Sequence, residues 1–283
     1  MLVNAKNDDE LIAIWLSRQG SEHTRAAYKL DVERALGYFD KRLGEILYED
    51  ITNWQEVLEG RYSASTVRRR IASLRSLLKF GWESGYLDNN VARLTKVPPQ
   101  SNKLTERILP RADVLDMIDA VEGRDRLIVQ TLYVLGLRVS ELTRLTWRNL
   151  RAHGDSGVAR VKGKGAKDRT LRVPKKLWDA LMELRLDEHG PDDAIFQSHT
   201  QDKGLHRKQV GRIVKRAARD AGIDLDENPV SPHWMRHAHA SHAIDAGVPL
   251  HVIRDNLGHS SLQITSRYLH ARPEQSSGAA LVA

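Results

Sequence analysis

A proline-containing polar stretch near residue 100 limits the fold more than any other feature, because it divides the chain in two. Residues 96–103 read Lys-Val-Pro-Pro-Gln-Ser-Asn-Lys and show no apolar periodicity. Consecutive prolines favour extended backbone, so this stretch is expected to be a tether between domains. At 283 residues the chain is long enough for two ordinary domains. We predict a first domain over residues 1–95, a linker over 96–109 and a second domain over 110–283.

The charge balance changes at the same boundary. Basic and acidic side chains are equal in number over residues 1–95, so the formal net charge of +7 belongs to the rest of the chain. A pI of about 9.6 makes nucleic acid the first partner to consider. The absence of cysteine excludes disulfides, cysteine zinc sites, iron–sulfur clusters and thiol nucleophiles. With no apolar run of membrane-spanning length and no signal-peptide pattern in residues 1–19, we expect no membrane segment and a cytoplasmic protein.

Apolar periodicity predicts helices throughout the first domain. We expect one helix over residues 8–17 and a second that begins near residues 21–24, with Leu30 and Phe39 facing inward. The clearest helix starts near residues 63–66. Its inward stripe consists of Val67, Ile71, Leu74, Leu77 and Leu78.

Four arginines lie beside that stripe: Arg68, Arg69, Arg70 and Arg75. They could be no more than a solvated helix face. Because three of them are consecutive and we expect no nearby acid to offset them, we predict that this helix contacts DNA.

The second domain is expected to be mainly helical with a small hairpin. Helices are predicted over residues 112–121 and 125–135, and strands over 158–161 and 170–173. The loop between the strands carries Lys162, Lys164 and Lys167. Its glycine spacing does not fit an ATP-binding loop, and Gly165 stands where Ser or Thr should bind magnesium. The loop is therefore either a basic tip that enters a DNA groove or a solvated turn.

Two further patches contain groups that could bind a phosphate. Arg138 follows a largely apolar run, so its guanidinium needs either an anion or the nearby Glu141 as partner. His233, Arg236 and His237 share one helical face. That face is compatible with a zinc site, with an acid–base histidine beside a phosphate-binding arginine, or with ordinary helix packing, and metal binding is the least favoured of the three.

A last patch follows a predicted helix end at Gly258. Ser260 or Ser261 is expected to cap the next helix, which places Tyr268 about two turns further on, with His259 at the junction. Taken alone, Tyr268 is also typical of an aromatic side chain that lies on a surface helix and packs at an interface.

Taken in order, these patches form a series that is far rarer than its parts. It runs Gly-Leu-Arg138-Val-Ser-Glu-Leu, Gly-Lys164-Gly, His233-x-x-Arg236-His, Leu-Gly-His259-Ser and Tyr268. The series resembles that of the tyrosine recombinases, or phage-integrase-type recombinases, and is most similar to their Xer-like branch. The resemblance implies a mainly α fold with a small β-sheet: a helical, SAM-like N-terminal DNA-binding domain followed by an α+β catalytic domain.

The resemblance also implies a site-specific recombinase that cleaves and rejoins DNA through a 3′-phosphotyrosine bond, with chemistry like that of type IB topoisomerases. Tyr268 would be the nucleophile, and Arg138, Arg236 and His259 would bind the phosphate oxygens. No metal or organic cofactor is expected, because the guanidiniums supply the positive charge.

Two proton transfers complete this expected site. His233 is the candidate general base for the phenol, and Lys164 is the candidate general acid for the departing 5′-oxygen. Lys167, three residues further along the same loop, is the alternative acid. The basic residues predicted to bind DNA outside the reaction centre are Arg68, Arg69, Arg70, Arg75, Lys162 and Lys167.

The implied partners are a double-stranded recombination site and further recombinase subunits, as a homotetramer on two sites or a heteromer with a related recombinase. The implied place of action is the nucleoid in the cytoplasm. Integration, excision and resolution of dimers or cointegrates all remain open. The alternatives are a non-catalytic, sequence-specific DNA-binding regulator of the same fold and, less favoured, a metal-dependent nuclease or phosphatase that uses the histidines. Only fifteen residues follow Tyr268, which leaves the mode of C-terminal exchange between subunits open.

Overall fold

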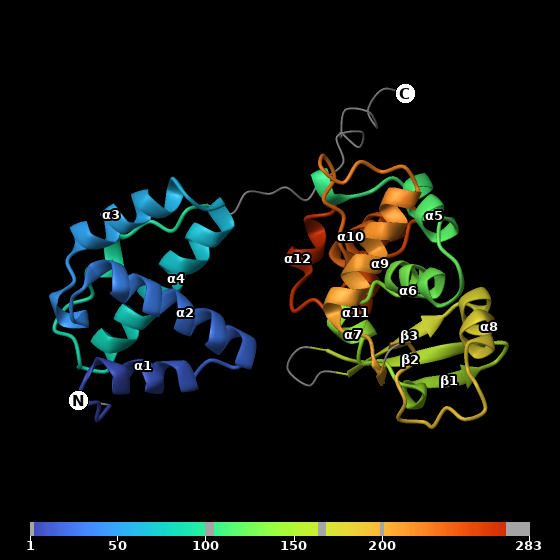
Figure 1. The fold of residues 1–283 in the computed structure, drawn as a ribbon, viewed down its shortest axis with the longest axis horizontal. Helices are drawn as coiled ribbons and strands as arrows, with labels where there is room; N and C mark the ends of the chain where they lie inside the picture. Colours follow the sequence, from blue (N-terminus) through green and yellow to red (C-terminus); the bar gives the residue numbers. More distant parts are fainter. Residues whose placement is uncertain (1–2, 100–104, 164–167, 199–200, 270–283) are drawn as a thin grey trace. The chain divides into compact units, whose positions relative to one another are not determined.

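The computed structural model describes residues 3–99, 105–163, 168–198 and 201–269 (Figure 1). The chain forms two compact units, Met1–Asn102 and Lys103–Ala283. The division falls inside the stretch expected to be a linker. The finer bounds of 1–95 and 110–283 stay a prediction.

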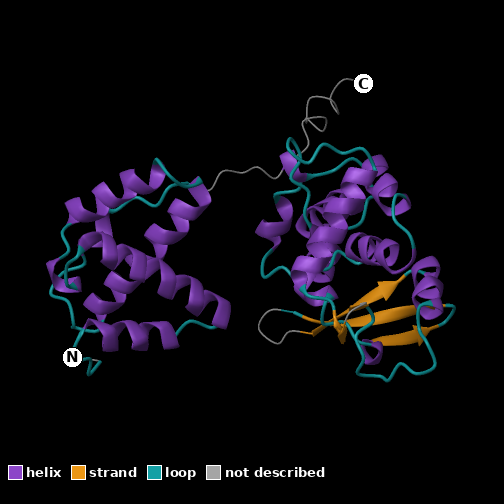
Figure 2. Ribbon diagram, in the orientation of Figure 1, coloured by secondary structure: helices purple, strands orange, loops and turns teal. Residues whose placement is uncertain are grey.

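The first unit is built from helices in the part that the structure describes (Figure 2). They are α1 (Asp8–Ser17), α2 (Glu22–Phe39), α3 (Tyr48–Glu59) and α4 (Ala64–Glu83), with short 3₁₀ turns at Leu43–Glu45 and Val91–Leu94. The Ser21 side chain caps α2 by accepting a hydrogen bond from the backbone of Thr24. The predicted stripe of α4 is confirmed, since all five of its apolar side chains are buried.

One inward assignment in this unit is wrong. Leu30 is 45% exposed, while its neighbour Asp31 is fully buried with Val32, Ala35 and Phe39. An apolar pattern ranks Leu ahead of Asp for burial, but it does not record that α4 offers Asp31 arginine partners.

The second unit combines helices with a small antiparallel sheet of order β1-β2-β3. Its helices are α5 (Arg111–Asp119), α6 (Gly123–Val134), α7 (Val139–Leu142), α8 (Lys175–Glu183), α9 (Arg207–Asp220), α10 (Pro232–Asp245), α11 (Leu250–Leu257) and α12 (Leu262–Ser266). Its strands are β1 (Leu150–His153), β2 (Ser156–Lys162), β3 (Asp168–Val173) and the small pair β4 (Gln197–Ser198) and β5 (Gln201–Gly204).

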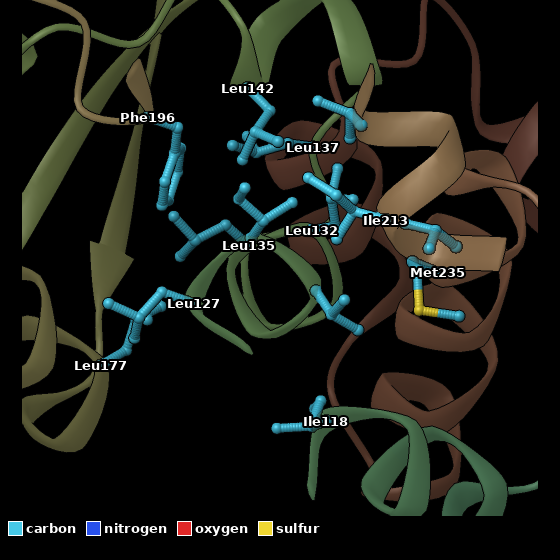
Figure 3. Close-up of a cluster of buried hydrophobic side chains, with 14 of the residues drawn as sticks. Ile118, Leu127, Leu132, Leu135, Leu137, Leu142, Leu177, Phe196, Ile213 and Met235 are labelled. Atoms are coloured by element: carbon cyan, nitrogen blue, oxygen red, sulfur yellow. The ribbon is translucent and has the colours of Figure 1, made fainter. Parts of the chain in front are cut away.

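Helix α6 lies at the centre of this unit and packs against α5, α8, α9 and α10. Leu132 of α6 and Leu135, the residue after its end, point into a cluster that also receives Phe196, Ile213 of α9 and Met235 of α10 (Figure 3). Burial of this many large apolar side chains fixes α10 against α6. The arrangement places Arg236 of α10 within hydrogen-bond distance of the carbonyl of Gly136, which follows α6.

The predicted hairpin is confirmed as β2 and β3, which pair from Gly157↔Val173 to Lys162↔Asp168. Helix α8 covers β2 so closely that a Cβ added at Gly157 would lie 1.9 Å from the Trp178 ring. Strand β1 and the pair β4–β5 were not predicted. No helix in the described ranges is long and apolar enough to cross a bilayer.

Candidate active site

Five of the six residues predicted to be catalytic lie around the C-terminal end of α11 in the second unit. Arg138 precedes α7, His233 and Arg236 lie in α10, His259 follows α11, and Tyr268 lies beyond the end of α12. The sixth, Lys164, falls outside the described residues, and so does Lys167. Lys162, at the end of β2, is exposed.

Arg236 is the most firmly held of these side chains. It is 1% exposed, and it donates hydrogen bonds to the carbonyls of Gly136 (2.7 Å) and Leu257 (2.5 Å). Gly136 has φ of +59°, and a Cβ there would meet the His239 ring at 2.7 Å, so glycine alone fits this approach. Burial, and then the charge of Arg138, lower the pKa of Arg236 to about 9, which leaves it cationic at neutral pH. These two bonds use two of the five N–H donors of the guanidinium.

Arg138 lies beside Arg236 and is held by a carboxylate. Its guanidinium donates to Glu141 at 2.9 Å, and Glu141 also accepts the Arg138 backbone N–H at 2.8 Å. The ion pair considered from the sequence is therefore confirmed. Arg138 remains about one-third exposed, so the pair does not consume its capacity to bind an anion. It also lies 3.5 Å from the same Leu257 carbonyl that Arg236 uses.

A third arginine, Arg169, completes this cluster. It binds Glu141 in bidentate fashion at 2.8 and 3.0 Å, and its Nε donates to the carbonyl of Asn256 at 2.6 Å. Burial alone would raise the pKa of Glu141, but hydrogen bonds and charge from Arg169 and Arg138 outweigh it and hold that pKa below its usual value. Three guanidiniums around one carboxylate leave two net positive charges, which suits an anionic ligand.

His259 is fixed next to this cluster. Gly258 ends α11 in the left-handed conformation (φ +63°), as expected, and Ser261 is the N-cap residue of α12. The His259 Nδ1 lies 2.9 Å from the Thr265 hydroxyl. Burial, and then the charges of the arginines, lower its pKa to about 4, so the ring is neutral at pH 7.

Tyr268 does not lie on a surface helix. It follows the last turn of α12 and is only 4% exposed, packed with Ala240, Ile253 and Leu257. Burial raises the pKa of its phenol, against the lowering effect of Arg236 and Arg138. The tyrosine is therefore protonated at neutral pH and buried inside the second unit.

The hydroxyl of Tyr268 is bonded to a histidine that was not selected as catalytic. It lies 2.8 Å from Nδ1 of His237, and both side chains are buried. The ring centroids of His237 and His233 are 4.3 Å apart in a T-shaped contact. The side chain of His233, the predicted base, reaches the surface. The protein still removes part of the water around its ring, and this desolvation, followed by the charges of Arg236 and Arg138, lowers the pKa of His233.

Three members of the site were missed or undervalued in the sequence. Arg169 had a detectable signal, because alternation along β3 places it on the same face as the buried Leu171 and Val173. His237 was noted only as the i+4 neighbour of His233. Nothing in the local sequence indicates that Glu141 pairs with Arg169 as well as with Arg138, because Arg169 lies 28 residues away.

The structure offers no support for the zinc alternative. Within the described part of the chain, no group of three or more His, Asp or Glu side chains is arranged to hold a metal ion. His239 and His242 instead pack against α6, with Nδ1 atoms 2.8 Å from the Tyr133 carbonyl and 2.9 Å from the Tyr133 hydroxyl, respectively.

The arginines of α4 divide into two kinds. The expectation that no acid offsets them is wrong, because the buried Asp31 forms an ion pair with Arg69 and lies 3.9 Å from Arg70. Arg70 is 5% exposed, and its guanidinium lies 3.9 Å from the Tyr62 ring centroid, so it has little surface for DNA. Arg68, which donates to the Pro98 carbonyl at 2.6 Å, and Arg75 are half-buried. DNA contact by these arginines stays a prediction.

Comparison with known proteins gives matches over both units. Residues 107–275 match the phage integrase family, and residues 11–84 match the phage integrase N-terminal SAM-like domain. The tyrosine recombinase XerD of Yersinia pestis is 30% identical over 283 residues, covering 94% of this chain and 92% of the relative. The tyrosine recombinase XerC of Pelobacter propionicus is 32% identical over 269 residues, covering 89% of this chain and 86% of the relative.

Two solved structures share the fold. The XerH site-specific recombinase in a post-cleavage complex with palindromic difH substrate aligns with a TM-score of 0.78 at 20% identity, over 98% of this chain and 85% of that chain. A lambda integrase tetramer bound to a Holliday junction aligns with a TM-score of 0.78 at 18% identity, over 95% of this chain and 78% of that chain.

Proposed function

This chain belongs to the phage integrase family and is a site-specific tyrosine recombinase, and from that premise we propose how its side chains cleave and rejoin DNA. The observation that carries the proposal is the cluster of Arg138, Arg236 and Arg169 around one carboxylate, with the phenol of Tyr268 beside it. A phosphodiester repels nucleophiles because it is an anion. Fixed guanidiniums offset that charge.

In the proposed reaction, the scissile phosphate binds to Arg138 and Arg236, with His259 as a further donor. The Tyr268 oxygen attacks phosphorus, an O–P bond forms, and the bond from phosphorus to the 5′-oxygen breaks. The five-coordinate transition state carries more negative charge on its non-bridging oxygens than the substrate does. Preorganised donors stabilise that additional charge, which lowers the barrier.

Each proton has a proposed destination. The leaving 5′-oxygen takes a proton from Lys164, with Lys167 as the alternative donor on the same loop. The phenolic proton of Tyr268 can pass to His233, as the sequence predicts, or to His237, which the hydroxyl contacts. Rejoining reverses these transfers when a 5′-hydroxyl from another strand attacks the phosphotyrosine. The bond energy is kept in the ester, so no ATP is needed.

DNA binding is proposed to use both units. Arg68, Arg69 and Arg75 of α4 and Lys162 of β2 supply positive charge outside the reaction centre. The lambda integrase structure holds a tetramer on a Holliday junction, and we propose a tetramer here too, as identical subunits or with a related recombinase. We place the reaction on the nucleoid, in the cytoplasm.

A nicked suicide duplex tests the proposed function. Footprinting, beginning with the DNA that flanks the gene, defines the bound site. A nick next to the scissile phosphate then lets the short 5′-hydroxyl strand diffuse away and traps the adduct. The wild type should form a covalent protein–DNA complex that Tyr268→Phe does not form. A wild type without an adduct on its own site, or an adduct with Tyr268→Phe, contradicts the proposal.

The two alternative functions predict different results in the same assay. A non-catalytic regulator binds the site but neither forms the adduct nor relaxes a supercoiled plasmid. A metal-dependent nuclease loses its activity when EDTA is added. The proposed mechanism predicts adduct formation at an unchanged rate in EDTA.

A further inference from the structure

Of the two candidate acceptors for the phenolic proton, His237 is the one that contacts the nucleophile. Its Nδ1 lies 2.8 Å from the hydroxyl oxygen of Tyr268, the atom that attacks the phosphate. Among the described residues, the structure gives this hydroxyl no other hydrogen-bond partner. His233 contacts the His237 ring rather than the tyrosine.

The direction of this hydrogen bond follows from burial. Tyr268 and His237 are 4% and 8% exposed, and the apolar side chains around Tyr268 cannot accept its proton. A buried hydroxyl that donates to nothing is costly, so the phenol donates and Nδ1 accepts. The neutral imidazole then carries its own proton on Nε2. The bond to be broken in the reaction, O–H of Tyr268, therefore points at a free lone pair.

We infer, on the basis of the proposed function, that His237 rather than His233 is the catalytic residue that receives the phenolic proton of Tyr268. During cleavage the Tyr268 oxygen bonds to phosphorus, its proton moves to Nδ1 of His237, and the 5′-oxygen leaves with a proton from the general acid. During rejoining the tyrosine oxygen is the leaving group, and the His237 imidazolium returns the proton to it.

The electrostatic surroundings decide when this transfer becomes favourable. Desolvation first, and then the charges of His233, Arg107, Arg236 and His259, lower the pKa of His237 to about 3. The lone pair is thus free at physiological pH, but without DNA the imidazolium is too unstable to form. A bound phosphate adds negative charge next to Arg236, which favours the protonated ring. The phenol also becomes far more acidic as its oxygen bonds to phosphorus, so a weak base suffices.

Chemical rescue tests the assignment in the full-length protein. His237→Ala should slow single-turnover cleavage of the suicide duplex by about 10²–10⁴-fold, the range for loss of a general base. Added imidazole should raise the rate with a saturable dependence on its concentration, because it fills the vacated space. The parallel variant His233→Ala should show no imidazole rescue. A wild-type rate in His237→Ala, or rescue confined to His233→Ala, overturns the inference.

A second variant distinguishes the loss of a base from a folding defect. His237→Gln keeps a hydrogen-bond acceptor for Tyr268 but cannot take a proton at neutral pH, so it should bind the site normally in a gel shift and still cleave slowly. A His237→Gln protein that cleaves at the wild-type rate overturns the inference by showing that His237 only positions the hydroxyl.

The matched control lies on the same helix. His242→Ala removes a histidine that also bonds a tyrosine hydroxyl, that of Tyr133, away from the reacting atoms. It should cleave at close to the wild-type rate and gain nothing from imidazole. The wild type and Tyr268→Phe are measured in the same assay. A wild type that forms no adduct refutes the proposed function. An active wild type, together with a His237→Ala variant that imidazole does not rescue, refutes only the role of His237.

Discussion

Glu141 is the carboxylate shared by two of the three arginines in the active site. It is 7% exposed, and it binds both Arg138 and Arg169. Removing one partner of a buried ion pair leaves the other charge without compensation, which costs far more than the pair contributes. The effect of substituting Glu141 should therefore reach beyond one lost contact.

We expect Glu141→Gln to lower the free energy of unfolding of the second unit by about 3–5 kcal/mol, measured by urea denaturation. The control is Asp192→Asn, which removes the exposed partner of Arg148 and should cost less than about 1 kcal/mol. Equal effects from the two substitutions would show that the Glu141 network is no more than a surface pair.

The buried histidines predict how stability depends on pH. Burial is the main cause that lowers the pKa of His237 to about 3 and that of His239 and His259 to about 4. An unfolded histidine titrates near 6.5, so between pH 4 and 6.5 the unfolded chain binds more protons than the folded one. Stability is then present at neutral pH and is lost as the pH falls through this window.

We expect the urea midpoint to fall between pH 7 and pH 5, with each such histidine contributing up to about 1.4 kcal/mol per pH unit. Glu141 contributes little there because its pKa lies below its usual value. His239→Gln should flatten the profile. A midpoint that does not change over this range would mean that these rings are not held neutral.

At the scale of elements, the arginines of α4 differ in how deeply they are buried. Arg70 is buried between Asp31 and the Tyr62 ring, and so it belongs to the core of the first unit. Arg75 is half-buried, beside Lys79 and Trp82 in a groove. These two arginines, five residues apart on one helix, therefore differ in burial: Arg70 has a structural role, and Arg75 is the one we expect to contact DNA.

We expect Arg75→Ala to weaken DNA binding and to reduce the slope of log K against log salt by about one. Arg70→Ala should leave that slope unchanged and instead destabilise the first unit by at least about 1 kcal/mol, since a desolvated cation–π contact is lost. Fluorescence anisotropy over a range of salt, together with thermal unfolding, measures both. A slope that changes only in Arg70→Ala would reverse the two roles.

The elements that could be predicted from the sequence are those with a long repeating pattern. Helix α4 repeats its apolar positions over 20 residues, and the β2–β3 hairpin alternates around a glycine- and lysine-containing loop. Strand β1 has one buried residue, Leu150, and β4 has two residues in all, so neither offers a period to detect.

The same distinction applies to the site. A motif identifies residue types such as Arg138 and Tyr268, because their order along the chain can be recognised. It does not reveal which side chains meet in space. The bond from Tyr268 to His237 spans 31 residues and the pair of Asp31 with Arg69 spans 38, and no local pattern encodes either of them.

At the scale of the whole molecule, the residues that the structure describes form one main hydrophobic core in each unit. Leu74 belongs to the one in the first unit and Met235 to the one in the second, and both side chains are fully buried. Units with independent cores unfold as separate cooperative transitions.

We expect two transitions in calorimetry. Leu74→Ala should lower the stability of one unit by about 2–5 kcal/mol and leave the other transition in place, and Met235→Ala should do the reverse. A single transition that both substitutions shift would show that the units unfold as one.

The carbonyls of Gly136 and Leu257 that hold Arg236 have a consequence for inheritance. A carboxylate that orients an arginine disappears with one codon change, whereas a backbone carbonyl is present whatever amino acid is encoded. Mutation can therefore release Arg236 only by displacing the chain around it, for example by adding a Cβ at Gly136. Lineages can vary the DNA-contacting surface of this protein and still transmit the orientation of its buried arginine intact.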